Sequence, residues 1–306
     1  MRKAALALCS GITLFASSAV AAEPVVLAEP APQTPSGAPA DRPVPELEWR
    51  WSRFSMADWA ITLGSGGVTL AMAIVKPVAG HKLTGGIWFD EGARSAVRPD
   101  DITTRYNFRD ASDVGVSLLA TWPFFADALT TAWWHRGSRD VAEQMALIDL
   151  EAMAITGAIQ GVTNVAVSRE RPYGRDCGTD ELPGAALDCV NSTHYRSFFS
   201  GHSAFAFTSA SLICVHHFQQ ELLGAPWDAI SCTGGYAVAA TTAFFRVLGD
   251  VHYMSDILTG ALVGTAVGWG VPLLHYASGT SAGMRVGEVR VDLVPTAGGL
   301  GVAGVF

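Results

Sequence analysis

Six long apolar stretches, separated by polar or Gly- and Pro-containing segments, limit the folds open to this chain. Each is long enough for a helix and rich in helix-forming residues, which predicts helices that are apolar on most faces. Hydrophobic residues make up 49% of the chain and charged residues only 16%, below the usual quarter for a soluble domain. We therefore expect an all-α fold, a six-helix bundle. The stretches are residues 58–76, 113–134, 139–168, 201–218, 228–246 and 254–276.

The N-terminal segment has the pattern of a secretory leader. Arg2 and Lys3 precede an apolar run, and Ala19-Val20-Ala21 fits a small-x-small cleavage site. An uncleaved membrane anchor is the alternative. Residues 23–47 then hold seven of the fifteen prolines, which is typical of an extended linker. We expect four segments: a signal peptide at 1–21, a linker at 22–50, a helical domain at 51–280 with its core at 114–276, and a tail at 281–306.

The tail has a different period from the rest of the chain. Val289, Val291 and Leu293 alternate with charged residues, and a Pro- and Gly-containing turn follows. This pattern predicts a short C-terminal β-hairpin.

The predicted leader indicates that the domain lies in the periplasm or outer cell envelope. Asp127, Asp149 and Glu151 interrupt the apolar stretches, and residues 219–228 contain no Lys or Arg. Both features disfavour bilayer spans. We expect a compact bundle outside the inner membrane, with possible membrane association; an integral protein with six spans is the alternative.

Three segments concentrate the polar residues of this apolar chain. The first, residues 168–173, contains Arg171; the second, residues 199–203, contains Ser200-Gly201-His202; the third, residues 246–256, runs from Arg246 through His252 to Asp256.

Together these residue types predict an anion site. The guanidinium group of arginine can donate two parallel hydrogen bonds to phosphate oxygens. Ser200-Gly201 precedes an apolar helix, whose first backbone N–H groups are unpaired. His252 and Asp256 are spaced four apart, so we expect them to share a helix face, with the carboxylate orienting the imidazole as a nucleophile. His202, on another helix, can donate a proton.

At these motifs the sequence resembles the type 2 phosphatidic acid phosphatase and vanadium haloperoxidase superfamily. Arg171-Pro172, then Ser200-Gly201-His202, then Arg246 with His252 and Asp256 match its pattern in order and spacing over about residues 114–276. The resemblance implies the six-helix bundle of that superfamily. Phe199 replaces a proline of the pattern and Phe245 a serine.

The resemblance also implies roles. His252 attacks phosphorus, Asp256 orients it, and His202 protonates the leaving oxygen. Arg171, Arg246 and the Ser200-Gly201 backbone hold the phosphoryl oxygens. Asn164 stands where the pattern has lysine, and we include it among the phosphate-binding residues.

The expected activity is a metal-independent phosphatase, an acid phosphatase or phosphatidic acid phosphatase-type hydrolase, with a phosphohistidine intermediate. Its partner is a phosphorylated small molecule, a lipid or a polyprenyl phosphate. We expect no cofactor and no metal site, with vanadate as an inhibitor. The net charge of −8 disfavours nucleic acid. The alternatives are a vanadium-dependent haloperoxidase-like oxidoreductase and a catalytically degenerate member of the fold.

Four cysteines follow the leader, and an even number in an exported protein predicts disulfides. Cys177 and Cys189 share the loop between Arg171 and His202. If His202 and Arg246 meet on antiparallel helices, Cys214 and Cys232 lie about 18 and 21 Å from the site, at nearly one level. We expect these two pairings; buried free thiols are the alternative for Cys214 and Cys232.

Overall fold

The computed structural model describes residues 46–77, 83–277, 282–286, 289–296 and 299–305, with side chains described up to residue 277. The predicted signal peptide and most of the predicted linker lie outside the described residues. Those two segments therefore stay predictions.

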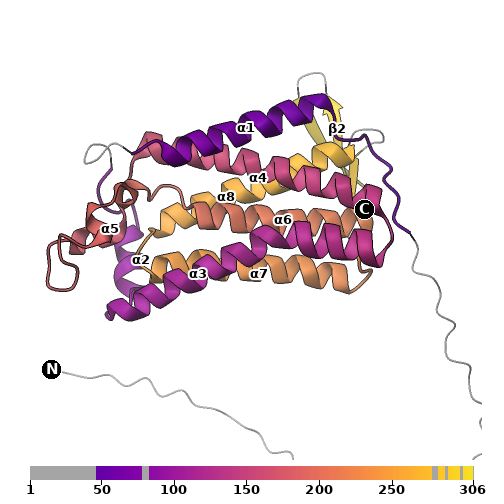
Figure 1. The fold of residues 1–306 in the computed structure, drawn as a ribbon. Coiled ribbons are helices and arrows are strands. Elements are labelled where there is room, and N and C mark those ends of the chain that lie inside the picture. Colours follow the sequence, from indigo (N-terminus) through magenta and orange to yellow (C-terminus); the bar gives the residue numbers. More distant parts are fainter. Residues whose placement is uncertain (1–45, 78–82, 278–281, 287–288, 297–298, 306) are drawn as a thin grey trace, which may run out of the picture. The chain divides into compact units, whose positions relative to one another are not determined.

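The described chain is all-α apart from its C-terminal segment, which confirms the predicted all-α class; the six-helix bundle of the superfamily's kind stays a prediction. It contains eight α-helices, and six of them are long and correspond to the six apolar stretches (Figure 1). The helical elements are α1 (Met56–Ile74), α2 (Asp90–Val97), α3 (Ile102–Trp122), η1 (Pro123–His135), α4 (Arg139–Val167), η2 (Pro172–Asp176), α5 (Leu187–Val190), η3 (Ser192–Tyr195), α6 (Gly201–Gln220), α7 (Trp227–Leu248) and α8 (Met254–Ala277).

One helix begins much earlier than its apolar stretch. The sequence placed this start at residue 113, whereas α3 begins at Ile102. Asp101 caps it, because its carboxylate accepts from the backbone N–H of Thr104 at 2.7 Å. The added turns contain the charged residues Arg105 and Arg109. The prediction was based on apolar runs, so it did not include these turns.

Helix α6 lies at the centre of the bundle and packs against α3, α4, α7 and α8. Its contact with α8 is close, because Gly260, Gly264 and Gly268 place one glycine per turn against the α6 backbone. A Cβ at Gly264 would lie 2.2 Å from the carbonyl oxygen of Ala204. This approach fixes the first turn of α8 beside the first turn of α6, where two of the three motifs lie.

Both predicted disulfides are present, Cys177–Cys189 and Cys214–Cys232. The first closes the loop between η2 and α5, and the second joins α6 to α7. The alternative of two buried thiols is therefore wrong.

Much of the helical surface is apolar. Among the described residues, three helices are long and apolar enough to cross a membrane: α1, α4 and α8. Helix α1 buries only Thr62, and Leu70 and Ile74 are 72% and 81% exposed. Water-exposed apolar surface of this extent marks a membrane or partner contact. The three apolar helices are consistent with membrane association; export to the periplasm stays a prediction.

The C-terminal segment has three strands, β1 (Ala282–Val286), β2 (Val289–Thr296) and β3 (Gly299–Val305), paired antiparallel in that order. Strands β2 and β3 occupy the place of the predicted hairpin. The side chains of these strands lie outside the described residues, and the hairpin stays a prediction.

Candidate active site

Seven of the eight predicted site residues come together at one end of the helices. The site is bordered by the N-termini of α6 and α8, the C-terminus of α7 and the segment between α4 and α6. Figure 1 shows α2 and α5 at this same end. The eighth, Asn164, lies close by in the last turn of α4.

His252 lies in the turn between α7 and α8, not on α8 itself. Its Nδ1 is 2.7 Å from the carbonyl oxygen of Ser197. A carbonyl only accepts, so Nδ1 carries the proton and Nε2 keeps its lone pair. Burial lowers the pKa of His252 to about 3, and the ring is therefore neutral at ordinary pH. This is the protonation state that a nucleophilic imidazole needs.

Asp256 does not hold His252 in the way the sequence suggested. Its Oδ2 is 3.8 Å from Nδ1 of His252, beyond hydrogen-bond length, because His252 precedes the helix. Instead, Oδ2 accepts from the hydroxyl of Ser197 at 2.6 Å and from the backbone N–H of Tyr253 at 2.9 Å. Asp256 thus fixes the two segments that hold His252, and Ser197 makes the direct contact.

Arg169 is the largest correction to the sequence analysis, which gave it no role in the site. Its side chain is fully buried, and it donates to Asp256 at 2.6 Å and to Asp90 at 2.7 Å. It also lies over the ring of Tyr253. Arg169 therefore ties α2 to the start of α8. The sequence around Arg169, next to Arg171, gave no indication that its side chain is buried.

Arg171 and Arg246 place two cations in this site. Burial lowers the pKa of both guanidinium groups, that of Arg246 to about 9, and Arg171 adds repulsion to Arg246. Arg246 donates from Nη1 to Asp113 at 2.8 Å. The Nε atoms of both arginines are buried and have no hydrogen-bond partner among the described residues. Two buried donors without an acceptor make a site for an anion.

The N-terminus of α6 offers further donors, and of the two residues expected to supply them only Gly201 does. Ser200 caps the helix through its hydroxyl, and its own backbone N–H donates to the carbonyl of Asp256 at 3.1 Å. Ser200 is therefore a cap and not an anion ligand. Gly201 and His202 are the first helical residues, whose N–H groups have no carbonyl partner within the helix. These two N–H groups can bind oxygens at the positive end of the helix dipole.

His202 pairs with a residue that the sequence analysis did not identify. Its Nε2 is 2.7 Å from Oδ1 of Asp113, the same oxygen that accepts from Arg246. Burial, and then repulsion from Arg246, lower the pKa of His202 to about 4. Asp113 lies on α3 and is 59% exposed. In the sequence, Asp113 is a single carboxylate at the start of an apolar stretch, and no pattern there indicates that it contacts His202.

Asn164 does not replace the lysine of the pattern. Its side chain is 1% exposed, and Nδ2 donates to the carbonyl of Phe198 at 3.2 Å. One turn earlier, Gln160 donates to the carbonyl of Phe199 at 3.1 Å. The two amides hold the backbone before Ser200, so Asn164 positions the loop. Its role as a phosphate ligand has no support in this geometry.

Comparison with known proteins agrees with this arrangement. Residues 146–279, which contain all three motifs, match the PAP2 superfamily. A stretch of 146 residues, 48% of this chain, is 27% identical to the lipid A 1-phosphatase of Porphyromonas gingivalis. The chain spans about a quarter of that relative's length, since the matched part is 27% of it. No solved structure matches the chain significantly. Residues 146–279 are thus similar to the PAP2 superfamily, and the matched relative supports its phosphatase branch.

Proposed function

We propose that this protein is a membrane-associated lipid phosphatase that hydrolyses phosphate monoesters through a phosphohistidine on His252. The observation that carries the proposal is the pair of buried Nε donors of Arg171 and Arg246, which lack acceptors among the described residues. A phosphoryl group would satisfy both and offset the repulsion between the two cations. The neutral ring of His252, with its tautomer set by Ser197, supplies the nucleophile.

In the first step the Nε2 lone pair of His252 attacks phosphorus, and the P–N bond forms as the P–O bond to the leaving group breaks. The leaving oxygen takes a proton from His202. Arg171, Arg246 and the N–H groups of Gly201 and His202 hold the three non-bridging oxygens. Fixed donors of this kind stabilise charge that develops in the transition state.

In the second step water attacks the phosphohistidine, and His202, now neutral, takes the proton of that water. The P–N bond breaks, and its electron pair returns to Nε2. Asp113 keeps the ring of His202 in place through both steps, since it accepts from both His202 and Arg246.

A lipid phosphate is the favoured substrate. The relative in Porphyromonas gingivalis acts on lipid A, and this chain has exposed apolar helices that suit a membrane. We therefore propose the phosphorylated headgroup of an envelope lipid. The haloperoxidase alternative is less well supported, because Asn164 contacts Phe198 and adds no cation to the site.

The test uses full-length protein in detergent micelles with a lipid monophosphate, and the measurement is phosphate release. We expect release in the presence of a chelator, and none from His252→Ala. His202→Ala should still be phosphorylated by a substrate with a good leaving group, since that step needs no acid. Mass spectrometry after alkaline quench locates the phosphate, because a P–N bond hydrolyses in acid. His135→Gln, at the exposed end of η1, is the matched histidine control and should keep wild-type turnover.

Two outcomes would overturn the proposal. One is phosphate trapped on a residue other than His252. The other is activity that a chelator abolishes and a divalent ion restores at a temperature where the fold is intact.

A further inference from the structure

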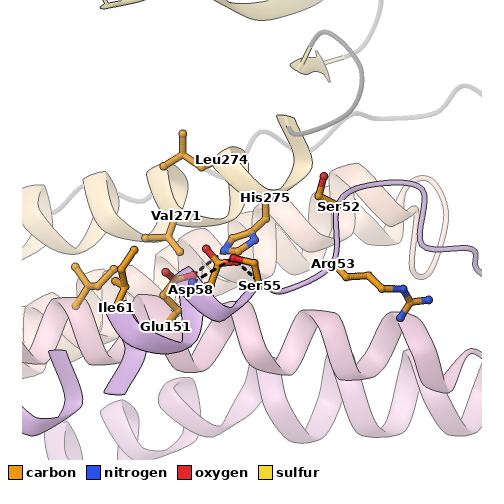
Figure 2. A pocket seen from close by; sticks show the side chains of 10 residues that line it. Ser52, Arg53, Ser55, Asp58, Ile61, Glu151, Val271, Leu274 and His275 are labelled. Atoms are coloured by element: carbon orange, nitrogen blue, oxygen red, sulfur yellow. Dashed lines mark hydrogen bonds and ion pairs between the residues drawn. The ribbon is translucent and has the colours of Figure 1, made fainter. Parts of the chain in front are cut away.

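A second group of polar side chains, drawn in Figure 2, lies away from the candidate active site. Asp58 comes from the first turn of α1, Glu151 from the middle of α4 and His275 from the last turn of α8. Nineteen residues separate His275 from Asp256 along α8, which is about 28 Å of helix. The group is therefore remote from the candidate active site and takes no part in the mechanism above.

The three side chains converge. His275 Nε2 is 2.6 Å from Glu151 Oε2, and one ligand atom from each of the three residues lies within 4.8 Å of the others. Glu151 is 5% exposed and His275 11%. They line a cavity of about 390 Å³ with apolar walls that include Ile61 and Leu274. Figure 2 shows the three polar groups pointing toward one another.

The charge of this cavity is not balanced by a permanent cation among the residues that line it. Arg53 is the lining arginine, but its guanidinium group binds both oxygens of Asp140, at 2.8 Å from Nη2 to Oδ2. In Figure 2 its side chain extends away from the carboxylates. Two carboxylates at close range repel each other unless a proton or cation sits between them. Phe54 stacks on the ring of His275 and limits its rotation.

We propose that Asp58, Glu151 and His275 form a binding site for a divalent transition-metal ion of the Zn²⁺ or Mn²⁺ kind. One imidazole and two carboxylates are a donor set that these ions accept, whereas Mg²⁺ and Ca²⁺ prefer oxygen ligands alone. Three protein ligands leave a position for water, and the cavity has room for one. The sequence predicted no metal site, because these ligands lie far apart along the chain.

The ion would fasten α1 to the bundle. Helix α1 buries only Thr62, so its packing against α4 gives it little apolar anchorage. A metal that joins its first turn to α4 and α8 would stabilise the folded state, since ligands that bind only this state raise the unfolding temperature. The site is structural in this reading, and the inference does not depend on the proposed phosphatase activity.

The experiment uses the full-length protein in detergent after treatment with a chelator and dialysis. Zn²⁺, Mn²⁺ and Mg²⁺ are added separately, and thermal unfolding and calorimetric binding are measured. We expect one Zn²⁺ or Mn²⁺ per chain and a Tm that rises with its concentration, with little effect of Mg²⁺. Glu151→Gln and His275→Gln should lose the binding and the rise in Tm. Glu143→Gln, on the same helix and paired with Arg139, is the matched control and should keep both.

Asp58→Asn serves as the second variant, because Asp58 is only partly buried and the amide oxygen of asparagine can still accept from the backbone N–H of Ser55, as Asp58 does. It should keep the metal-free Tm and lose the visible absorption that Co²⁺ gains when it binds the wild-type site. The inference fails if neither Zn²⁺ nor Mn²⁺ changes the wild-type Tm. It also fails if the three ligand variants bind the metal as tightly as Glu143→Gln does.

Discussion

Binding of a phosphate-like dianion should draw a proton onto His202. In the protein without ligand, burial and repulsion from Arg246 lower the pKa of His202 to about 4. The ring is then neutral at pH 6 and cannot act as an acid. An anion held by Arg171 and Arg246 would bring negative charge next to His202 and reverse this effect.

The size of the change follows from Coulomb's law. One net negative charge about 4 Å from the ring, at an effective dielectric constant of about 20, is worth roughly 4 kcal/mol. Since 1.36 kcal/mol corresponds to one pKa unit, the pKa of His202 should rise from about 4 to roughly 7. We counted one charge of the dianion because solvent screens the rest at a side chain that is 28% exposed.

The assay is calorimetry of tungstate binding at pH 6, in two buffers with different enthalpies of ionisation. Tungstate keeps its charge of −2 at this pH, so any proton taken up comes to the protein. With the pKa values above, we expect about 0.9 proton per tungstate bound. His202→Gln should remove most of this uptake, whereas His135→Gln, at the exposed end of η1, should not. Equal uptake in wild type and His202→Gln would refute the reasoning.

Three further results are expected. Arg169→Met leaves two buried carboxylates without a cation and should lower the free energy of unfolding by about 3–5 kcal/mol, measured by chemical denaturation in detergent. Arg171→Gln and Arg246→Gln should each lower kcat by about 10²–10³-fold, as loss of one transition-state donor does, and the double variant should lose vanadate inhibition. The third concerns pH: between about 6.5 and 3 the unfolded chain protonates His252 and the folded protein does not. Stability should therefore fall as pH drops through this window, and less steeply in His252→Gln; parallel pH profiles would contradict this.

The sequence predicted the helices and the motif residues well, because both depend on short-range patterns. Apolar runs of helix length located the six long helices to within a few residues, except α3, which begins earlier and ends at Trp122, where η1 continues to His135. Motif spacing located Arg171, His202, Arg246 and His252, all of which meet at one end of the bundle. The rise per residue of a helix predicted the Cys214–Cys232 pair. It places both cysteines at nearly the same distance from the site along two antiparallel helices.

Other features depend on contacts across the bundle, and the sequence carries no record of these. Every residue has a backbone carbonyl, so the sequence could not indicate that His252 donates a hydrogen bond to the carbonyl of Ser197. Arg169 and Arg175 are both charged residues near the same motif, yet one is fully buried against Asp90 and Asp256 and the other pairs with Glu91 at 47% exposure.

The order of residues along the chain therefore determined which groups could do the chemistry and which helices would carry them. The packing of α3, α4 and α8 around α6 decided which partner each carboxylate takes: Asp113 contacts His202, Asp256 contacts Ser197, and Glu151 contacts His275. The physical reason is that a hydrogen bond requires a separation of about 3 Å, and only close packing of helices from distant parts of the chain sets separations that short.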